Sequence, residues 1–180
     1  LFFLCLPVSA NAQETPANRV QHFIDKILNE KFGDRFGLNQ SGQFGVLSKR
    51  LINLIKIAEC DCEKANNEES RPLPWVDADM FFDRWDTPTA CSVKTTTPVA
   101  GGLSISMDCI WGKNKDHQPG SKMQVLVKLV KDGVHWNIDN VIHGQQEDGA
   151  STKTDLIQRV TQAGNQSTDP AVCKKAFGVN

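Results

Sequence analysis

Apolar residues near the start of the chain recur with the period of a helix. They fall at positions i, i+3, i+4, i+7 and i+8, namely Val20, Phe23, Ile24, Ile27 and Leu28, and this spacing places them on one helix face. Thr15 offers a hydroxyl for the N-cap, and Pro16 suits the first helical position because its missing N–H would have no partner there. We therefore expect an amphipathic helix that begins at Pro16 and ends before Gly33.

A second apolar stripe with the same period follows a loop of polar residues and glycine. Its members are Leu47, Leu51, Leu54, Ile55, Ala58 and Cys62. Basic residues occupy the opposite side, among them Lys49, Arg50 and Lys56. An amphipathic helix is stabilised mainly by packing its apolar face, so the rest of the chain must supply a surface for both helices.

The middle of the chain alternates between apolar and polar residues, as a half-buried strand does. Two such segments, with turn residues between them, span 91–97 and 103–111. A hairpin centred between them sets two opposite pairs, Cys91 with Cys109 and Val93 with Met107. All four residues then lie on the same apolar face, which supports this register.

A second hairpin is predicted around Lys131-Asp132-Gly133-Val134, because Asp-Gly is a preferred two-residue turn. Pairing Lys131 with Val134 sets the pairs Leu129 with Trp136, Val127 with Ile138, Val125 with Asn140 and Met123 with Ile142. His135, Asn137 and Asp139 then share the opposite face, which we expect to be solvated. Residues 151–163 are read as a last helix.

Two helices followed by a curled antiparallel sheet of about four strands predict a two-layer α+β fold. The sheet would be cone-like, with a C-terminal helix or tail after it. We expect a single α+β domain over residues 13–165 and a tail over 166–180 that is tethered by Cys173.

The first twelve residues are typical of a secretory leader. An apolar run, Leu1 to Val8, precedes the small residues Ser9-Ala10-Asn11-Ala12, the pattern that a signal peptidase reads. We expect residues 1–12 to be a signal-peptide remnant that is cleaved near Ala12, so that the mature protein is periplasmic or secreted. A buried N-terminal strand is the alternative. No stretch reaches the roughly 18 apolar residues of a membrane span.

Export makes disulfides the expected state of the remaining cysteines. The hairpin register favours a Cys91–Cys109 bridge. A second bridge would join Cys173 to Cys62 or to Cys60, between which the spacing does not choose. The odd thiol is either free or joins a second copy, so a homodimer stays open. We expect no metal, because Cys60-Asp61-Cys62 lacks the usual two-residue gap between zinc ligands.

Residues 127–141 read VKLVKDGVHWNIDNV. This segment resembles the closing hairpin of the nuclear transport factor two-like, cystatin-like superfamily. Those proteins often end their sheet in a similar "Leu-x-Lys-x-Gly-x-Trp-x-Ile-x-x-Val" phrase. Together with WVDADMFF at residues 75–82, the layout looks like an exported bacterial branch of unknown function. The resemblance covers roughly residues 16–145 and implies a cone-shaped fold. It implies no single activity, because the superfamily holds isomerases, dehydratases and binding modules.

The densest unusual segment runs from residue 75 to residue 86 and holds four carboxylates and four aromatic rings. Aromatic rings can hold a ligand and carboxylates can orient it. The residues predicted to contact a ligand or partner are Trp75, Asp77, Asp79, Phe81, Trp85 and Asp86. Alternatively, the rings pack this segment onto the core and the carboxylates are helix caps or solvated charges.

Nothing in the sequence marks a catalytic residue or a cofactor site. Nucleophile, phosphate-binding and dinucleotide motifs are absent, and His22 and His143 have no evident partner for acid–base work. The chain has no tyrosine, the oxyanion donor typical of isomerases in the resembled superfamily. A formal net charge of -1 argues against nucleic acid.

The sequence therefore favours a non-catalytic, exported binding or interaction protein. Its partner would be a protein, a peptide or a small molecule, and an envelope immunity or accessory protein is one version. The alternative is a small periplasmic enzyme in which burial raises the pKa of Asp77 or Asp79, making it a general base.

Overall fold

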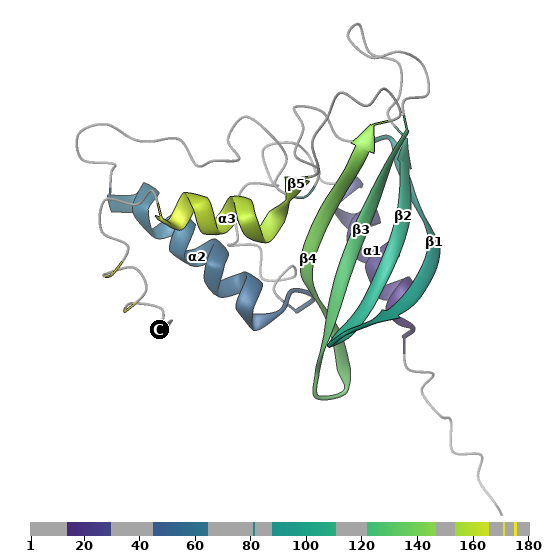
Figure 1. Cartoon of the computed structure of the whole chain (residues 1–180), viewed down its shortest axis with the longest axis horizontal. Coiled ribbons are helices and arrows are strands. Elements are labelled where there is room, and N and C mark those ends of the chain that lie inside the picture. The colour runs from purple at the N-terminus through teal and green to yellow at the C-terminus, as the bar shows by residue number, and fades with distance from the viewer. Residues whose placement is uncertain are drawn as a thin grey trace, which may run out of the picture.

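The computed structural model describes residues 14–29, 45–64, 81, 88–110, 122–146 and 154–165, together with the single positions 171 and 175. The elements in chain order are α1 (Pro16–Asn29), α2 (Lys49–Lys64), β1 (Ala90–Val99), β2 (Gly102–Ile110), β3 (Lys122–Asp132), β4 (His135–Gln146), β5 (Thr154–Asp155) and α3 (Leu156–Asn165). The strands form one antiparallel sheet in the order β1-β2-β3-β4-β5 (Figure 1). The predicted α+β class is confirmed.

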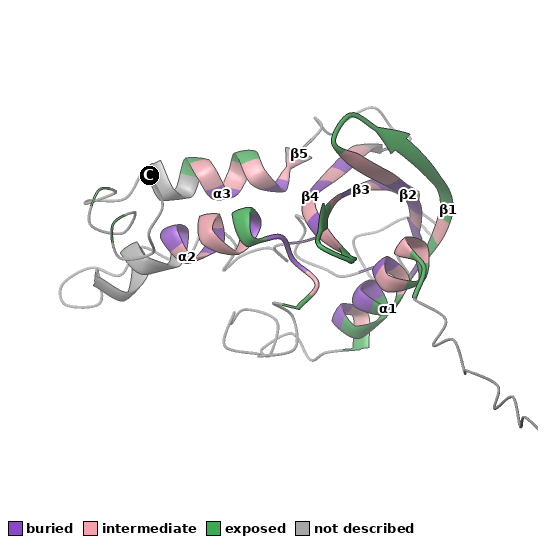
Figure 2. Ribbon diagram, turned by 90° about the horizontal axis from the view of Figure 1, so that it is seen from below, coloured by how far each residue is buried: buried purple, intermediate pink, exposed green. Residues whose placement is uncertain are grey.

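The sheet is curved and unclosed, and the helices lie in two places around it (Figure 2). Helix α1 lies on the concave side and packs against β1. Helices α2 and α3 lie side by side beyond β4 and β5 (Figure 1). The two N-terminal helices therefore cover different parts of the sheet. None of the helices within the described residues is long and apolar enough to span a lipid bilayer.

One apolar core joins the helices to the inner face of the sheet. The predicted stripe of α1 contributes the buried residues Val20, Phe23, Ile24 and Ile27. Helix α2 contributes Leu51, Ile55 and Ala58, and Leu47 joins them from the segment before this helix. The sheet contributes Ile105, Met107, Cys109, Val125, Val127, Leu129, Ile138 and Val141, and α3 contributes Leu156 and Val160. The periodicities of the sequence thus predict most of the core.

Each of the three helices is directly preceded by a residue whose side chain accepts a hydrogen bond from the backbone N–H three residues later. Thr15 does so for α1 at 3.2 Å, Ser48 for α2 at 3.0 Å and Asp155 for α3 at 3.2 Å. The first N–H groups of a helix have no partner within the helix, and hydroxyl or carboxylate oxygens satisfy them. The predicted N-cap of the first helix, Thr15, is confirmed.

The predicted register of the first hairpin is also confirmed. Cys91 lies opposite Cys109 and Val93 lies opposite Met107. A disulfide joins the two cysteines across the strands. Beyond this point the register shifts between Val93 and Thr95.

The predicted register of the second hairpin is wrong. Asp132 pairs with His135, so Gly133 and Val134 form the turn, and Leu129 lies opposite Ile138 rather than Trp136. Gly133 has a φ of 61°, which a residue without Cβ adopts readily. Because Leu129 and Ile138 are almost fully buried, matching them in the core outweighs the local preference for Asp-Gly at the turn centre.

Two further shifts separate β4 from the predicted pairing. The pairs Lys128–Asn140 and Leu129–Ile138 leave Asp139 as an extra residue, and a second shift follows near the end of the strand. Val127 therefore lies opposite Val141. An extra residue reverses the facing of all residues beyond it, and Val141 rather than Ile142 joins the core.

Both edges of the sheet are partly covered. On the β4 side, Ser48 N–H donates to the Ile138 carbonyl and Ile138 N–H donates to the Val46 carbonyl, both at 2.7 Å. On the β1 side, the Gln21 amide donates to the Cys91 carbonyl at 2.9 Å and accepts from Val93 N–H at 3.1 Å. Open sheet edges promote pairing between molecules. By occupying backbone groups at both edges, these contacts disfavour such pairing.

Candidate functional site

A pocket lies where the start of α1 faces the start of β4. Its volume is about 260 Å³, and its walls are formed by Glu14, Arg19, Val134, His135 and Trp136. The β3–β4 turn and the start of β4 form one wall, and the first turn of α1 together with Glu14, two residues before the helix, forms the other. The pocket therefore joins parts of the chain that are more than a hundred residues apart.

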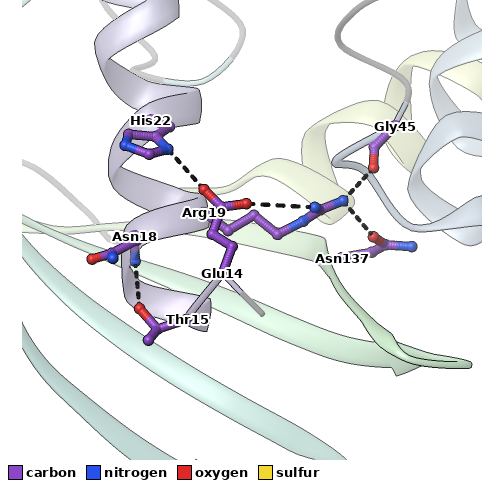
Figure 3. Close-up of polar contacts among 7 residues, drawn as sticks. All are labelled: Glu14, Thr15, Asn18, Arg19, His22, Gly45 and Asn137. Carbon is purple, nitrogen blue, oxygen red and sulfur yellow. Dashed lines mark hydrogen bonds and ion pairs between the residues drawn. The ribbon is translucent and has the colours of Figure 1, made fainter. Parts of the chain in front are cut away.

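Arg19 is held in place from three directions (Figure 3). Its Nη2 donates to the Gly45 carbonyl and, at 3.4 Å, to Oδ1 of Asn137. Its Nη1 lies 3.8 Å from Oε2 of Glu14. Nε is buried and has no hydrogen-bond partner among the described residues. The guanidinium thus links α1, the segment before α2 and strand β4 while Nη1 makes only a loose ion pair.

Glu14 precedes α1 and contacts two cationic or titratable groups. Its Oε1 lies 2.7 Å from Nδ1 of His22, and its Oε2 faces Arg19 (Figure 3). The sequence showed no partner for His22, and the fold supplies one in Glu14. The carboxylate is exposed and paired, whereas a general base of the kind proposed from the sequence needs an apolar, buried setting.

The β4 wall of the pocket combines apolar area with a nearby cation. Val134 is 64% exposed at the turn, and Trp136 is half-buried one residue beyond the exposed His135. The Lys131 ammonium lies over the indole, 5.9 Å from the ring centroid. The predicted position of Trp136 opposite Leu129 is replaced by a place opposite Lys131, near the end of the hairpin.

A second polar cluster surrounds Asp139. Its Oδ1 accepts a hydrogen bond from the Ser48 hydroxyl at 2.6 Å, and its Oδ2 lies 3.0 Å from Nη2 of Arg50. The side chain is only 13% exposed. The prediction that this face of β4 is solvated is therefore wrong for Asp139. It is also incomplete for Asn137, whose side chain contacts Arg19. The physical reason is that the start of α2 lies against this part of β4.

Among the site residues predicted from the sequence, the structure describes Phe81. Its side chain is buried and meets Phe23 edge to face, with ring centroids 5.2 Å apart. Its carbonyl accepts a hydrogen bond from Nε2 of His143, which is itself buried. The sequence shows no partner for His143, because the bulges of β4 that turn it into the core have no sign in the local pattern.

Other predicted residues lie outside the part of the chain that the structure describes. They are Trp75, Asp77, Asp79, Trp85 and Asp86 of the candidate segment, residues 1–12 of the expected leader, and the side chains of Cys60, Cys62 and Cys173. For these residues the expectations stay predictions. Of the candidate segment, the structure describes Phe81, which packs on the core.

The sequence patterns did not indicate the pocket. Arg19 and Asn137 are 118 residues apart, and each sits on the polar side of its own element, where periodicity predicts only solvent exposure. Glu14 lies just before the helix N-cap and carries no motif. One local signal was Trp136, which the strand alternation placed on the apolar face and which packs, partly buried, against the core.

Within the described residues, no group of three or more His, Cys, Asp or Glu side chains is placed to hold a metal ion. No family model, curated protein or solved structure matches the chain. The resemblance of residues 127–141 to the nuclear transport factor two-like hairpin therefore stays a prediction.

Proposed function

We propose that this chain is an exported, non-catalytic binding or interaction protein. The observation that carries the proposal is the pocket of about 260 Å³, which is lined both by Arg19, held by its neighbours, and by the half-buried Trp136. Arginine and tryptophan are enriched among the residues that dominate binding energies. The occupant would be a protein, a peptide or a small molecule, and an envelope immunity or accessory protein fits this description.

The disulfide supports the exported location. Cys91 and Cys109 are buried and bonded within the sheet, and such structural bridges persist in oxidising compartments and are rare in reducing ones. The leader-like residues 1–12 point in the same direction. Both features support a periplasmic or secreted protein.

The carboxylates near the pocket support binding over catalysis. Glu14 is paired with Arg19 and His22, and Asp139 is paired with Arg50 and Ser48. These contacts engage both carboxylates in holding segments of the chain together. The enzyme alternative depends on Asp77 and Asp79, which lie outside the described residues, and no described geometry favours it.

The test is affinity capture from an envelope extract by the folded, disulfide-bonded protein. Val134→Asp places a charge on the apolar wall of the pocket, and Ile110→Asp makes the same change at another exposed apolar residue, 38% exposed at the end of β2. We expect the captured protein or small molecule to be lost with Val134→Asp and retained with Ile110→Asp.

Two controls make the capture result decisive. Both variants should show the same circular dichroism and similar melting temperatures as the unmodified protein. If both variants capture the same species in the same amount as the unmodified protein, the pocket is not the binding site and the proposal fails.

A further inference from the structure

We infer that the pocket takes a carboxylate attached to an apolar or aromatic group, such as the last residue of a polypeptide or a small aryl acid. This inference rests on the proposed function and names the ligand class of the same pocket. It is carried by three features of the described residues: unused donors on Arg19, a cation on Lys131 without a carboxylate partner, and an apolar wall.

Arg19 still has hydrogen-bonding capacity toward the pocket. A guanidinium has five N–H donors, and the hydrogen bonds that Arg19 makes to other described residues leave from Nη2, to Gly45 and Asn137. Nη1 meets Glu14 only at 3.8 Å, beyond hydrogen-bond distance. An incoming carboxylate can take the Nη1 donors in a charge-assisted contact, while Glu14 keeps its 2.7 Å contact to His22.

The charges around the pocket favour an anion. Lys49 pairs with Asp132 at 3.6 Å, and Glu14 pairs with Arg19. Lys131 has no carboxylate within ion-pair distance among the described residues, and its ammonium lies over the Trp136 ring. Among the described residues, the charge of Lys131 is therefore uncompensated beside the pocket and attracts a monoanion.

Glu14 and the pocket walls narrow the class further. Because Glu14 lines the same pocket, a doubly charged ligand such as a phosphate would be repelled more strongly than a single carboxylate. Val134 and Trp136 supply apolar area that a small inorganic anion cannot use. The volume of about 260 Å³ lies below the roughly 300 Å³ at which pockets for drug-sized ligands begin, so one apolar residue fits.

The test follows the indole N–H resonance of Trp136 in a nitrogen-15 correlation spectrum, assigned with Trp136→Phe. The probes are N-acetyl-phenylalanine, its uncharged amide, phenylacetate and Gly-Gly-Phe. We expect saturable shifts with the acids and at least tenfold weaker binding of the amide. Phenylacetate binding as tightly as Gly-Gly-Phe would indicate a free small acid, and a clear preference for the tripeptide would indicate a chain terminus.

Variants locate the contact that the acids make. Lys131→Gln removes an exposed charge and should weaken binding by roughly up to fivefold, and Arg19→Gln should weaken it by roughly tenfold or more. Lys128→Gln, a matched change at an exposed lysine of the same strand, should leave the affinity unchanged. Since Arg19 also joins three segments, Lys131→Gln keeps the test valid if Arg19→Gln unfolds.

Equal binding of acid and amide, or no shift with any acid, would overturn the inference. The proposed function fails separately. If Val134→Asp abolishes capture from the envelope extract but no carboxylate binds, then the pocket binds a ligand of another class. If carboxylates bind and Lys128→Gln weakens them as much as Lys131→Gln, the binding site lies elsewhere on the sheet.

Discussion

At the scale of residues, the hydroxyl of Ser48 makes two hydrogen bonds with different roles. It accepts a hydrogen bond from Leu51 N–H at 3.0 Å, which caps α2, and donates one to Asp139 at 2.6 Å. Ser48 is 4% exposed, so water cannot easily take the place of its hydroxyl in the contacts with the Leu51 N–H and the Asp139 carboxylate. The Asp139 carboxylate thereby fixes the start of α2 on β4, close to the residues that hold Arg19.

Ser48→Ala should therefore lower the free energy of unfolding by about 1–3 kcal/mol, since it removes a helix cap and leaves a mostly buried carboxylate with one partner fewer. Chemical denaturation measures this loss. Ser92→Ala, at an exposed serine of β1, should change stability little. A double-mutant cycle with Asp139→Asn should show coupling between the two sites; additive losses would mean that the contact contributes nothing.

At the scale of elements, Gln21 of α1 acts on the outer edge of β1. Its amide contacts one backbone carbonyl and one backbone N–H, those of Cys91 and Val93, as a neighbouring strand would. The residue is on the side of α1 that faces β1, and its contacts lie next to the disulfide. It therefore helps to fix both the position of the helix and the edge of the sheet.

Gln21→Ala should make the Val93 amide hydrogen exchange faster, because that N–H loses its acceptor. Native-state hydrogen exchange followed by magnetic resonance measures the effect at this amide. Gln21→Glu keeps an acceptor oxygen but removes the donor to Cys91, and should leave Val93 better protected than Gln21→Ala does. Unchanged exchange at Val93 in both variants would show that the edge contact does not form in solution.

The elements also show what could be predicted from the sequence. The stripe from Val20 to Leu28 follows directly from the helix period. The Cys91–Cys109 pairing follows from the shared apolar face of the two strands, although an extra residue between Val93 and Thr95 separates this pair from the turn. The β3–β4 register could not be predicted, because nothing in the local sequence marks the bulge at Asp139, which interrupts the alternation of apolar residues. Arg19 and Asn137 meet only through the tertiary fold, so the pocket was invisible to any local pattern.

At the scale of the whole molecule, the sheet is covered on several sides and presents its pocket at one end. Helix α1 lies on the concave side, and α2 and α3 lie beyond β4 and β5 (Figures 1 and 2). The pocket is lined by residues of the β3–β4 turn and of the start of α1. The disulfide joins the two outermost strands of the opposite edge. This arrangement leaves a fixed scaffold with a small recess, as expected of a binding module.

The most direct test of the binding claim is site-specific photo-crosslinking. A benzophenone side chain replaces Val134 at the pocket in one protein and Lys128 on β3 in another, both exposed positions. After incubation with envelope extract and irradiation, we predict a defined adduct from position 134 that is absent from position 128 and is reduced by Lys131→Gln. The account would be contradicted if positions 134 and 128 gave the same adduct in equal yield, so that no adduct is specific to position 134.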